Sequence, residues 1–107
     1  MNTFDERKKG FEAKYINDQE SEFKIRAKRN KLIGLWAAEI IKPSNVDEYV
    51  KQVRLSDLEE PGDEDIIKKL LDDFENSSQK ISRNVIEEKL IELENLASEE
   101  FFNKKNN

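Results

Sequence analysis

The side chains that could do chemistry in this chain are carboxylates and basic groups, because cysteine and histidine are both absent. A thiol nucleophile, a disulfide framework, a Ser-His triad and zinc or haem sites with Cys or His ligands are therefore excluded. Aspartate and glutamate are plentiful, but no neighbouring base marks any of them for acid/base catalysis. We therefore expect a protein that is not an enzyme and that uses no cofactor.

Two patterns that could hold a phosphate or a metal ion are incomplete. Phosphate-binding loops need clustered glycines, whereas the three glycines of this chain are isolated. Asp63 and Asp65 are spaced like the start of a calcium loop, but Lys68 stands where that loop requires glycine. The acidic pair is better explained as a helix N-terminus, where the helix dipole favours negative charge. We predict no metal site.

The most concentrated positive charge is a basic run, formed by Lys24, Arg26, Lys28, Arg29 and Lys31. Residues 1–31 carry a net charge of +3 and residues 32–107 carry −8, which gives −5 overall. The run could contact phosphates, and Lys24, Arg26 and Arg29 are candidate nucleotide contacts. The acidic remainder would repel a nucleic acid, so no nucleic-acid partner is expected. An acidic protein partner and a plain solvated helix face are the other interpretations.

The elements that would position these groups are helices, because long stretches of Glu, Lys, Leu and Ile run between only two prolines and three glycines. Pro43 bars helix at the residue before it, and Glu60-Pro61-Gly62 forms a turn. Asn45, Asp63 and Ser82 are expected N-caps of the segments that follow. The predicted fold is an all-α four-helix bundle with a long first helix. Its helices are expected at 4–42, 46–59, 64–76 and 83–103.

Each predicted helix has an apolar face spaced for burial. Residues from Leu32 to Ile41 are apolar nearly all round, which is typical of a helix enclosed by others. Gly34 costs about 1 kcal/mol in a helix relative to Ala, so we expect another helix to cross closely there. The predicted shared core comprises Trp36, Tyr49, Val53, Ile67, Leu70, Phe74, Leu90 and Leu93.

The first part of the long helix differs from the rest because its apolar stripe is thin. Phe4, Phe11 and Tyr15 fall on one face and are separated by charged residues. Such a stripe does not stabilise an isolated helix, since most helical stability comes from packing. We expect a mobile arm that becomes helical in a partner's groove; simple capping of the bundle is the alternative. The predicted division is an N-terminal arm at 1–24, a bundle body at 25–103 and a frayed tail at 104–107.

Four stretches together resemble one family: Phe4-Asp5-Glu6-Arg7, Phe11-Glu12-Ala13-Lys14-Tyr15, RNKLIGLWAA from Arg29 to Ala38, and EEPGDED from Glu59 to Asp65. Similar stretches occur in the same order, and over nearly the whole chain, in the zeta subunit of alphaproteobacterial F1Fo-ATP synthase, which the chain therefore resembles. That family of F1-ATPase inhibitors was formerly described as a domain of unknown function. The resemblance implies a four-helix bundle whose N-terminal helix inserts into a catalytic interface of F1 and blocks ATP hydrolysis. The residues that fall in the family's inhibitory arm are Thr3, Phe4, Asp5, Arg7, Phe11, Glu12, Lys14 and Tyr15.

The resemblance also implies partners, namely the catalytic and rotor subunits of F1, with the chain monomeric when free. No apolar run approaches the roughly 18 residues of a membrane span, and the first residues lack signal-peptide features. We therefore expect no membrane insertion and a cytoplasmic location, peripheral to the inner membrane through F1. The alternative function is a nucleotide-binding helical sensor with weak or no inhibition.

Overall fold

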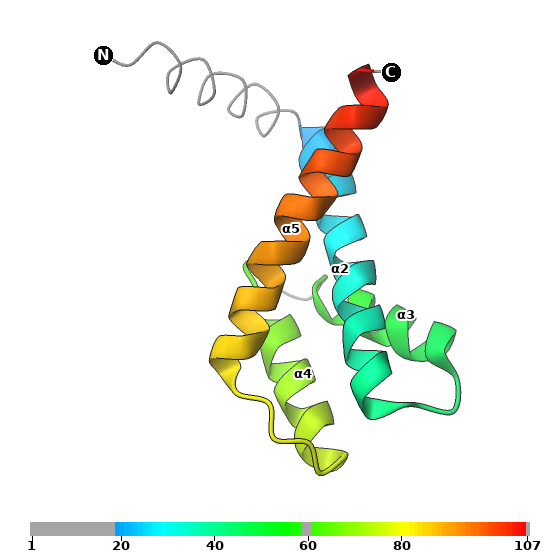
Figure 1. Cartoon of the computed structure of the whole chain (residues 1–107), viewed down its shortest axis with the longest axis vertical. Helices are drawn as coiled ribbons and strands as arrows, with labels where there is room; N and C mark the ends of the chain where they lie inside the picture. The colour runs from blue at the N-terminus through cyan, green and yellow to red at the C-terminus, as the bar shows by residue number, and fades with distance from the viewer. Residues whose placement is uncertain (1–18, 59–60, 107) are drawn as a thin grey trace.

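The computed structural model describes residues 19–58 and 61–106 of the 107-residue chain. All regular structure in these two ranges is helical, so the predicted all-α fold with four helices is confirmed. The helices are α2 (Gln19–Ile41), α3 (Val46–Ser56), α4 (Glu64–Asn76) and α5 (Arg83–Asn106) (Figure 1). The first part of the predicted long helix lies outside the described residues.

Helix α2 is central to the arrangement, since it packs against each of the other three helices and most extensively against α5 and α3. Helix α5 runs antiparallel beside α2, so the start of α2 and the end of α5 lie at the same end of the molecule (Figure 1). Helices α3 and α4 pack around the opposite end of α2. The bundle is therefore built on one long helix pair with two short helices at one end.

Three of the predicted helix boundaries are confirmed by local geometry. Helix α2 ends at Ile41, and Lys42 before the proline adopts the left-handed conformation with φ 58°. The Asn45 side chain caps α3 by accepting a hydrogen bond of 3.0 Å from the Glu48 amide. The Ser82 hydroxyl accepts a hydrogen bond of 3.3 Å from the Val85 amide at the start of α5.

Two helix ends lie three residues from their predicted positions, and one predicted cap is wrong. Helix α3 ends at Ser56 rather than 59, because the chain turns at Asp57 to direct its carboxylate towards α2. Helix α5 continues to Asn106, three residues beyond its predicted end. Asp63 stands at the N-cap of α4, but its side chain makes no capping hydrogen bond. That carboxylate is used in ion pairs instead, as described below.

The apolar core sits where all four described helices meet, and it contains seven of the eight predicted core residues. Trp36 is the exception, because one face of α2 points to solvent and the indole lies at the edge of the core. Its ring meets Phe74 edge-on, with 5.5 Å between ring centroids. The buried core comprises Ile33, Ala37, Ala38, Tyr49, Val53, Ile66, Ile67, Leu70, Phe74, Ile86, Leu90 and Leu93.

The close helix crossing predicted at Gly34 is confirmed. A Cβ atom added at this glycine would lie 3.3 Å from both the Cα and the Cγ1 atoms of Val50. The missing side chain therefore lets the backbones of α2 and α3 approach closely, which offsets the low helix propensity of glycine.

Within the described ranges, no helix is long and apolar enough to cross a membrane.

Candidate functional site

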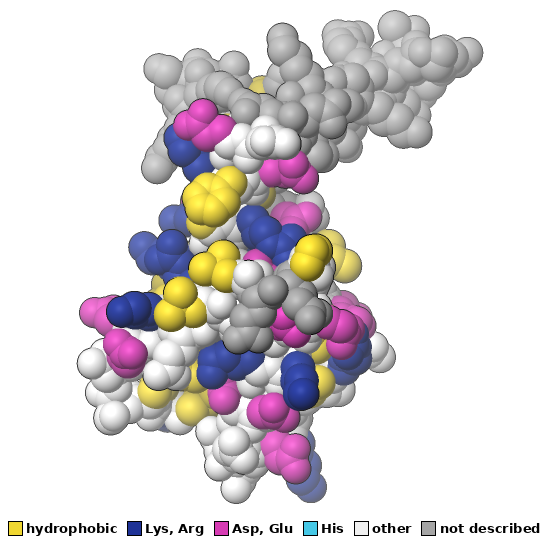
Figure 2. Space-filling view, turned by 180° about the vertical axis from the view of Figure 1, so that it is seen from behind, with side chains coloured by type: hydrophobic (Ala, Val, Ile, Leu, Met, Phe, Trp, Pro, Cys, Tyr) yellow, Lys and Arg dark blue, Asp and Glu magenta, His cyan; other side chains and the backbone are white. Residues whose placement is uncertain are grey.

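Charged side chains of both signs are interspersed over the face of the body that Figure 2 shows. Most ion pairs in the described ranges involve at least one well-exposed side chain, and such pairs contribute little to stability. One group differs because it contains two nearly fully buried charged side chains, Arg29 and Asp57. This ionic cluster consists of Arg26, Arg29, Asn30, Asp57, Asp63 and Glu94.

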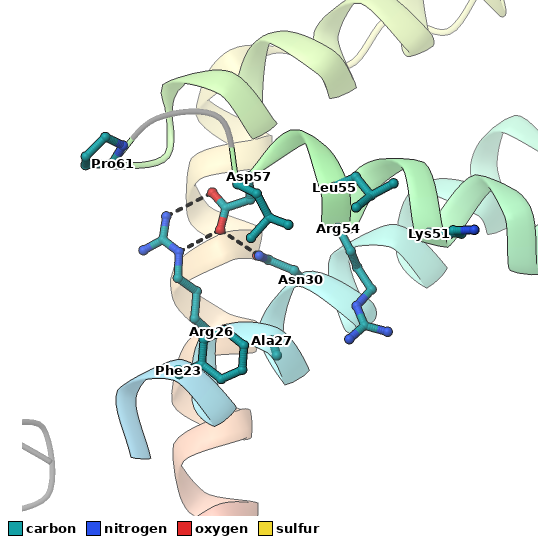
Figure 3. Close-up of a pocket in the computed structure, with 10 residues that line it drawn as sticks. Phe23, Arg26, Ala27, Asn30, Lys51, Arg54, Leu55, Asp57 and Pro61 are labelled. Carbon is teal, nitrogen blue, oxygen red and sulfur yellow. Dashed lines mark hydrogen bonds and ion pairs between the residues drawn. The ribbon is translucent and has the colours of Figure 1, made fainter. Parts of the chain in front are cut away.

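The cluster joins α2 to the α3–α4 connection through Arg26. The guanidinium of Arg26 donates to both carboxylate oxygens of Asp57, with Nε–Oδ2 at 2.6 Å and Nη2–Oδ1 at 2.9 Å (Figure 3). The same Nη2 lies 2.7 Å from the carbonyl oxygen of Gly62 and 2.8 Å from Asp63 Oδ1. One arginine therefore holds both ends of the connection against α2.

Gly62 can offer that carbonyl because it adopts a φ of +91°, in the region that favours glycine. It stands in the turn predicted from Glu60-Pro61-Gly62. The sequence pattern thus predicted the turn. The structure shows that the turn places the backbone carbonyl of Gly62 beside Arg26 as a hydrogen-bond acceptor.

Arg29 extends the cluster to α5. Its side chain is almost completely buried, and Nη1 lies 3.2 Å from Glu94 Oε1 while Nη2 lies 3.0 Å from Asp63 Oδ1. Both Nε and Nη2 donate to the side-chain oxygen of Asn30, at 3.0 and 2.9 Å. A buried charge is tolerated only when it is paired and hydrogen-bonded, and Arg29 meets both conditions.

Asp57 is the buried anion of the cluster, and Asn30 donates to its Oδ2 at 2.7 Å. Burial by itself would raise the pKa of the Asp57 carboxyl, but hydrogen bonds from Arg26 and Asn30 and the charges of Arg26 and Arg29 outweigh burial. The pKa of Asp57 therefore lies below its usual value, so the carboxylate is ionised at neutral pH. The hydrogen bond to Asp57 in turn raises the pKa of Arg26.

This arrangement fixes structure rather than performing a reaction. Two guanidinium groups face three carboxylates, so the charges of the cluster nearly cancel. Removing one member of a buried ion pair typically costs about 3–5 kcal/mol, because the other charge is left without compensation. The cluster therefore locks the N-terminal half of α2 to α5 and to the α3–α4 connection. In residues 19–58 and 61–106, no group of His, Cys, Asp or Glu is arranged to hold a metal ion.

Two of the three predicted nucleotide contacts, Arg26 and Arg29, belong to this ionic cluster. The third, Lys24, is exposed and pairs with Glu20 one helical turn earlier, at 3.0 Å. All three cations therefore have carboxylate partners, and the structure brings only two of them together. The nucleotide contact stays a prediction, and this geometry lends it no support.

The other predicted site residues, those of the inhibitory arm, lie outside the described residues: Thr3, Phe4, Asp5, Arg7, Phe11, Glu12, Lys14 and Tyr15.

Sequence reasoning missed Asn30, Asp57 and Glu94 as members of the ionic cluster. A signal for Asn30 exists, because Arg26, Arg29 and Asn30 follow the i, i+3, i+4 spacing of one helix face. Nothing in the sequence connects that face to Asp57 or to Glu94, which is 65 positions after Arg29. Such pairings are set by how the helices pack.

The family model described as ATPase inhibitor subunit zeta matches residues 1–100 of this chain. The match spans the ionic cluster, all of α2, α3 and α4 and most of α5, and it includes the residues that precede α2. A comparison with curated proteins gives no match.

Proposed function

The chain belongs to the ATPase inhibitor subunit zeta family, and from this premise we propose that it inhibits ATP hydrolysis by the F1 part of ATP synthase. The observation that carries the proposal is the extent of the match, which covers the N-terminal arm and the helical body together. The function is regulatory: the protein binds F1 and is not turned over.

The proposed effector is the N-terminal arm, residues 1–24, which inserts as a helix into a catalytic interface of F1. Its contact residues are the eight that the family resemblance implies: Thr3, Phe4, Asp5, Arg7, Phe11, Glu12, Lys14 and Tyr15. A bound segment stops a rotary enzyme only if it binds one rotational state much more tightly than the others. The arm therefore acts by holding the catalytic and rotor subunits in the state that its helix fits, which blocks rotation in the hydrolytic direction.

The proposed role of the body, residues 25–103, is to anchor that helix. The last residues of the arm, 19–24, already belong to α2, and the ionic cluster fixes the N-terminal half of this helix to α5 and the α3–α4 connection. An anchored base limits the orientations that the arm can take before docking, which reduces the entropy lost on binding. In this proposal the free protein is a monomer and reaches the membrane surface only through F1.

The alternative function, a nucleotide-binding sensor, has no specific observation in its favour. Its predicted contacts, Lys24, Arg26 and Arg29, are each engaged by carboxylates of the chain itself. We therefore retain inhibition as the single proposed function.

The proposal is tested by titrating the full chain into F1 that has been freed of its own zeta subunit and measuring the rate of ATP hydrolysis. The wild-type chain should inhibit. An arm variant, Phe11→Ser with Tyr15→Ser, should need at least about tenfold more protein, because it loses two apolar anchors. The matched control, Ile91→Ser, removes an exposed apolar side chain from α5 and should inhibit like wild type. A wild-type chain that leaves hydrolysis unchanged would refute the function.

A further inference from the structure

A groove of about 510 Å³ lies between the N-terminal half of α2 and the C-terminal half of α3. Phe23 and Ala27 line it from α2, and Leu55 lines it from α3 (Figure 3). Leu58 lines it from the turn that follows α3. The Arg26–Asp57 pair of the ionic cluster also lines it, so part of its wall is fixed by hydrogen bonds. Its size is in the range of preformed binding sites.

The groove exposes more large apolar surface than a solvated helix pair requires. Phe23 is 67% exposed, Leu55 is 51% exposed and Leu58 is 70% exposed, although they come from two different elements. Figure 2 shows exposed hydrophobic side chains beside Lys and Arg side chains on one face of the body. Single exposed apolar residues are ordinary, but several that converge on one concavity mark an interaction surface.

The described residues that line the groove carry a net positive charge, opposite in sign to that of the chain. Lys51 and Arg54 line it and form no ion pair within the described ranges. Among the described lining residues, the carboxylate of Asp57 is already paired with Arg26 and accepts a hydrogen bond from Asn30. Lys51 and Arg54 therefore place two positive charges beside the apolar side chains of the groove, in a chain whose net charge is −5.

We propose that this groove docks an amphipathic helical segment of the F1 partner, one whose apolar side chains are flanked by Asp or Glu. An apolar groove between two helices accepts apolar anchors at i, i+3 and i+4 of a third helix. Acidic residues beside those anchors would pair with Lys51 and Arg54, which gives the contact its specificity. An overall acidic chain with an apolar groove excludes nucleic acid as the occupant.

This inference rests on the proposed function for the identity of the partner. Tyr15, the last predicted contact of the arm, precedes Phe23 by only eight residues, which span at most about 28 Å. A partner held by the arm therefore lies within reach of the groove. Two contacts on one partner raise the affinity through effective concentration, without any change at either contact.

The decisive test compares two full-length variants with the same change in net charge. Lys51→Glu with Arg54→Glu reverses the groove charges, while Lys68→Glu with Lys80→Glu reverses two exposed charges outside the groove lining. Binding of each fluorescently labelled chain to F1 is measured directly, and ATP hydrolysis is measured in parallel. We expect the groove variant to bind F1 about tenfold more weakly and the control to stay within about twofold of wild type.

A second pair of variants tests the apolar part of the groove. Leu55→Ser with Leu58→Ser should weaken binding about fivefold to tenfold, because two apolar anchors are lost. Ile91→Ser, which changes a side chain 64% exposed on α5, should bind like wild type. Thermal unfolding of every variant verifies that the body is intact. Equal binding by groove and control variants would overturn the proposal.

The two readouts separate this inference from the proposed function. Groove-dependent binding without any inhibition of hydrolysis would support the groove and refute the function. Inhibition that is insensitive to both groove variants would support the function and refute the groove.

Two other occupants would also be revealed by these measurements. If the wild-type chain dimerises at assay concentration and the groove variants do not, the occupant is a second copy and the proposal fails. If the groove variants inhibit more strongly than wild type, the groove sequesters the chain's own arm, and the proposal again fails.

Discussion

The two halves of α2 are held in the body by different physical means. The C-terminal half contributes Ile33, Ala37 and Ala38 to the apolar core. The N-terminal half contributes Arg26, Arg29 and Asn30 to the ionic cluster. Both halves are well packed. Only the N-terminal half depends on groups whose charge and hydrogen-bond direction must match those of their partners.

The difference indicates what each half does for the molecule. Apolar burial is non-directional and supplies most of the folding free energy. A buried ion pair adds little net stability compared with apolar side chains of the same size, but it requires one geometry. We infer that the core makes the body stable, and that the ionic cluster sets the direction in which α2 leaves it. That direction matters because the proposed effector arm continues from this end of α2.

The largest expected effect comes from truncating the apolar core. Phe74 is 1% exposed and contacts Trp36 edge-on, so Phe74→Ala should lower the free energy of unfolding by about 4 kcal/mol. Urea titration at pH 7 measures this loss, and a repeat at pH 3 should give a similar loss because no ionisable group is removed. A loss below about 1 kcal/mol would show that this part of the core is not close-packed.

The next effect comes from the ionic cluster, and its signature is pH dependence. Asp57→Asn should cost about 3 kcal/mol at neutral pH, because Arg26 and Arg29 lose a buried counter-charge. The pKa of Asp57 is lower in the folded state, so its contribution is fully present above the unfolded pKa of about 3.9. The contribution is lost as the pH falls through the folded pKa.

The measurement is urea unfolding of wild type and Asp57→Asn between pH 2 and pH 7. The difference between the two proteins should be constant above about pH 4 and should shrink below it. If the difference in the free energy of unfolding stays the same at every pH, Asp57 acts through packing alone. The two halves of α2 would then be held by the same physical means.

A smaller effect is expected at the edge of the core. Trp36 is only partly buried, with Phe74 on one side and Lys89 Nζ at 5.8 Å from its ring centroid. Trp36→Ala should therefore cost about 2 kcal/mol, less than the truncation of a fully buried aromatic residue. Urea titration of this variant beside Phe74→Ala gives the comparison. Equal losses for the two would place the indole inside the core.

Most of the fold could be predicted from the sequence because its signals are local. Pro43, Asn45 and Ser82 mark helix ends through backbone geometry and capping, and the structure agrees at each. The spacing of apolar residues identified seven of the buried core residues, which lie on α3, α4 and α5. Gly34 predicted a close crossing, although the sequence could not name Val50 as the residue crossed.

The ionic cluster could not be predicted because its partners are distant in sequence. Asp63 was expected to cap α4, and only the packing of α2 beside it shows that its carboxylate serves Arg26 and Arg29. Asp57 likewise binds Arg26 instead of continuing α3, and the helix therefore ends before the predicted residue. Trp36 was predicted to be a core residue but is only partly buried. Periodicity predicts which face of a helix is buried, but not how completely each side chain on that face is covered.

The central claim is that the arm inhibits and the body supports it, and deletion of residues 1–17 tests it most directly. Two quantities are measured on the full chain and on the shortened chain: inhibition of ATP hydrolysis by F1 and the midpoint of thermal unfolding. The account predicts that inhibition is lost while the midpoint moves by no more than about 3 °C, because the core and the ionic cluster are both retained. A shortened chain that inhibits as strongly as the full one would contradict the claim.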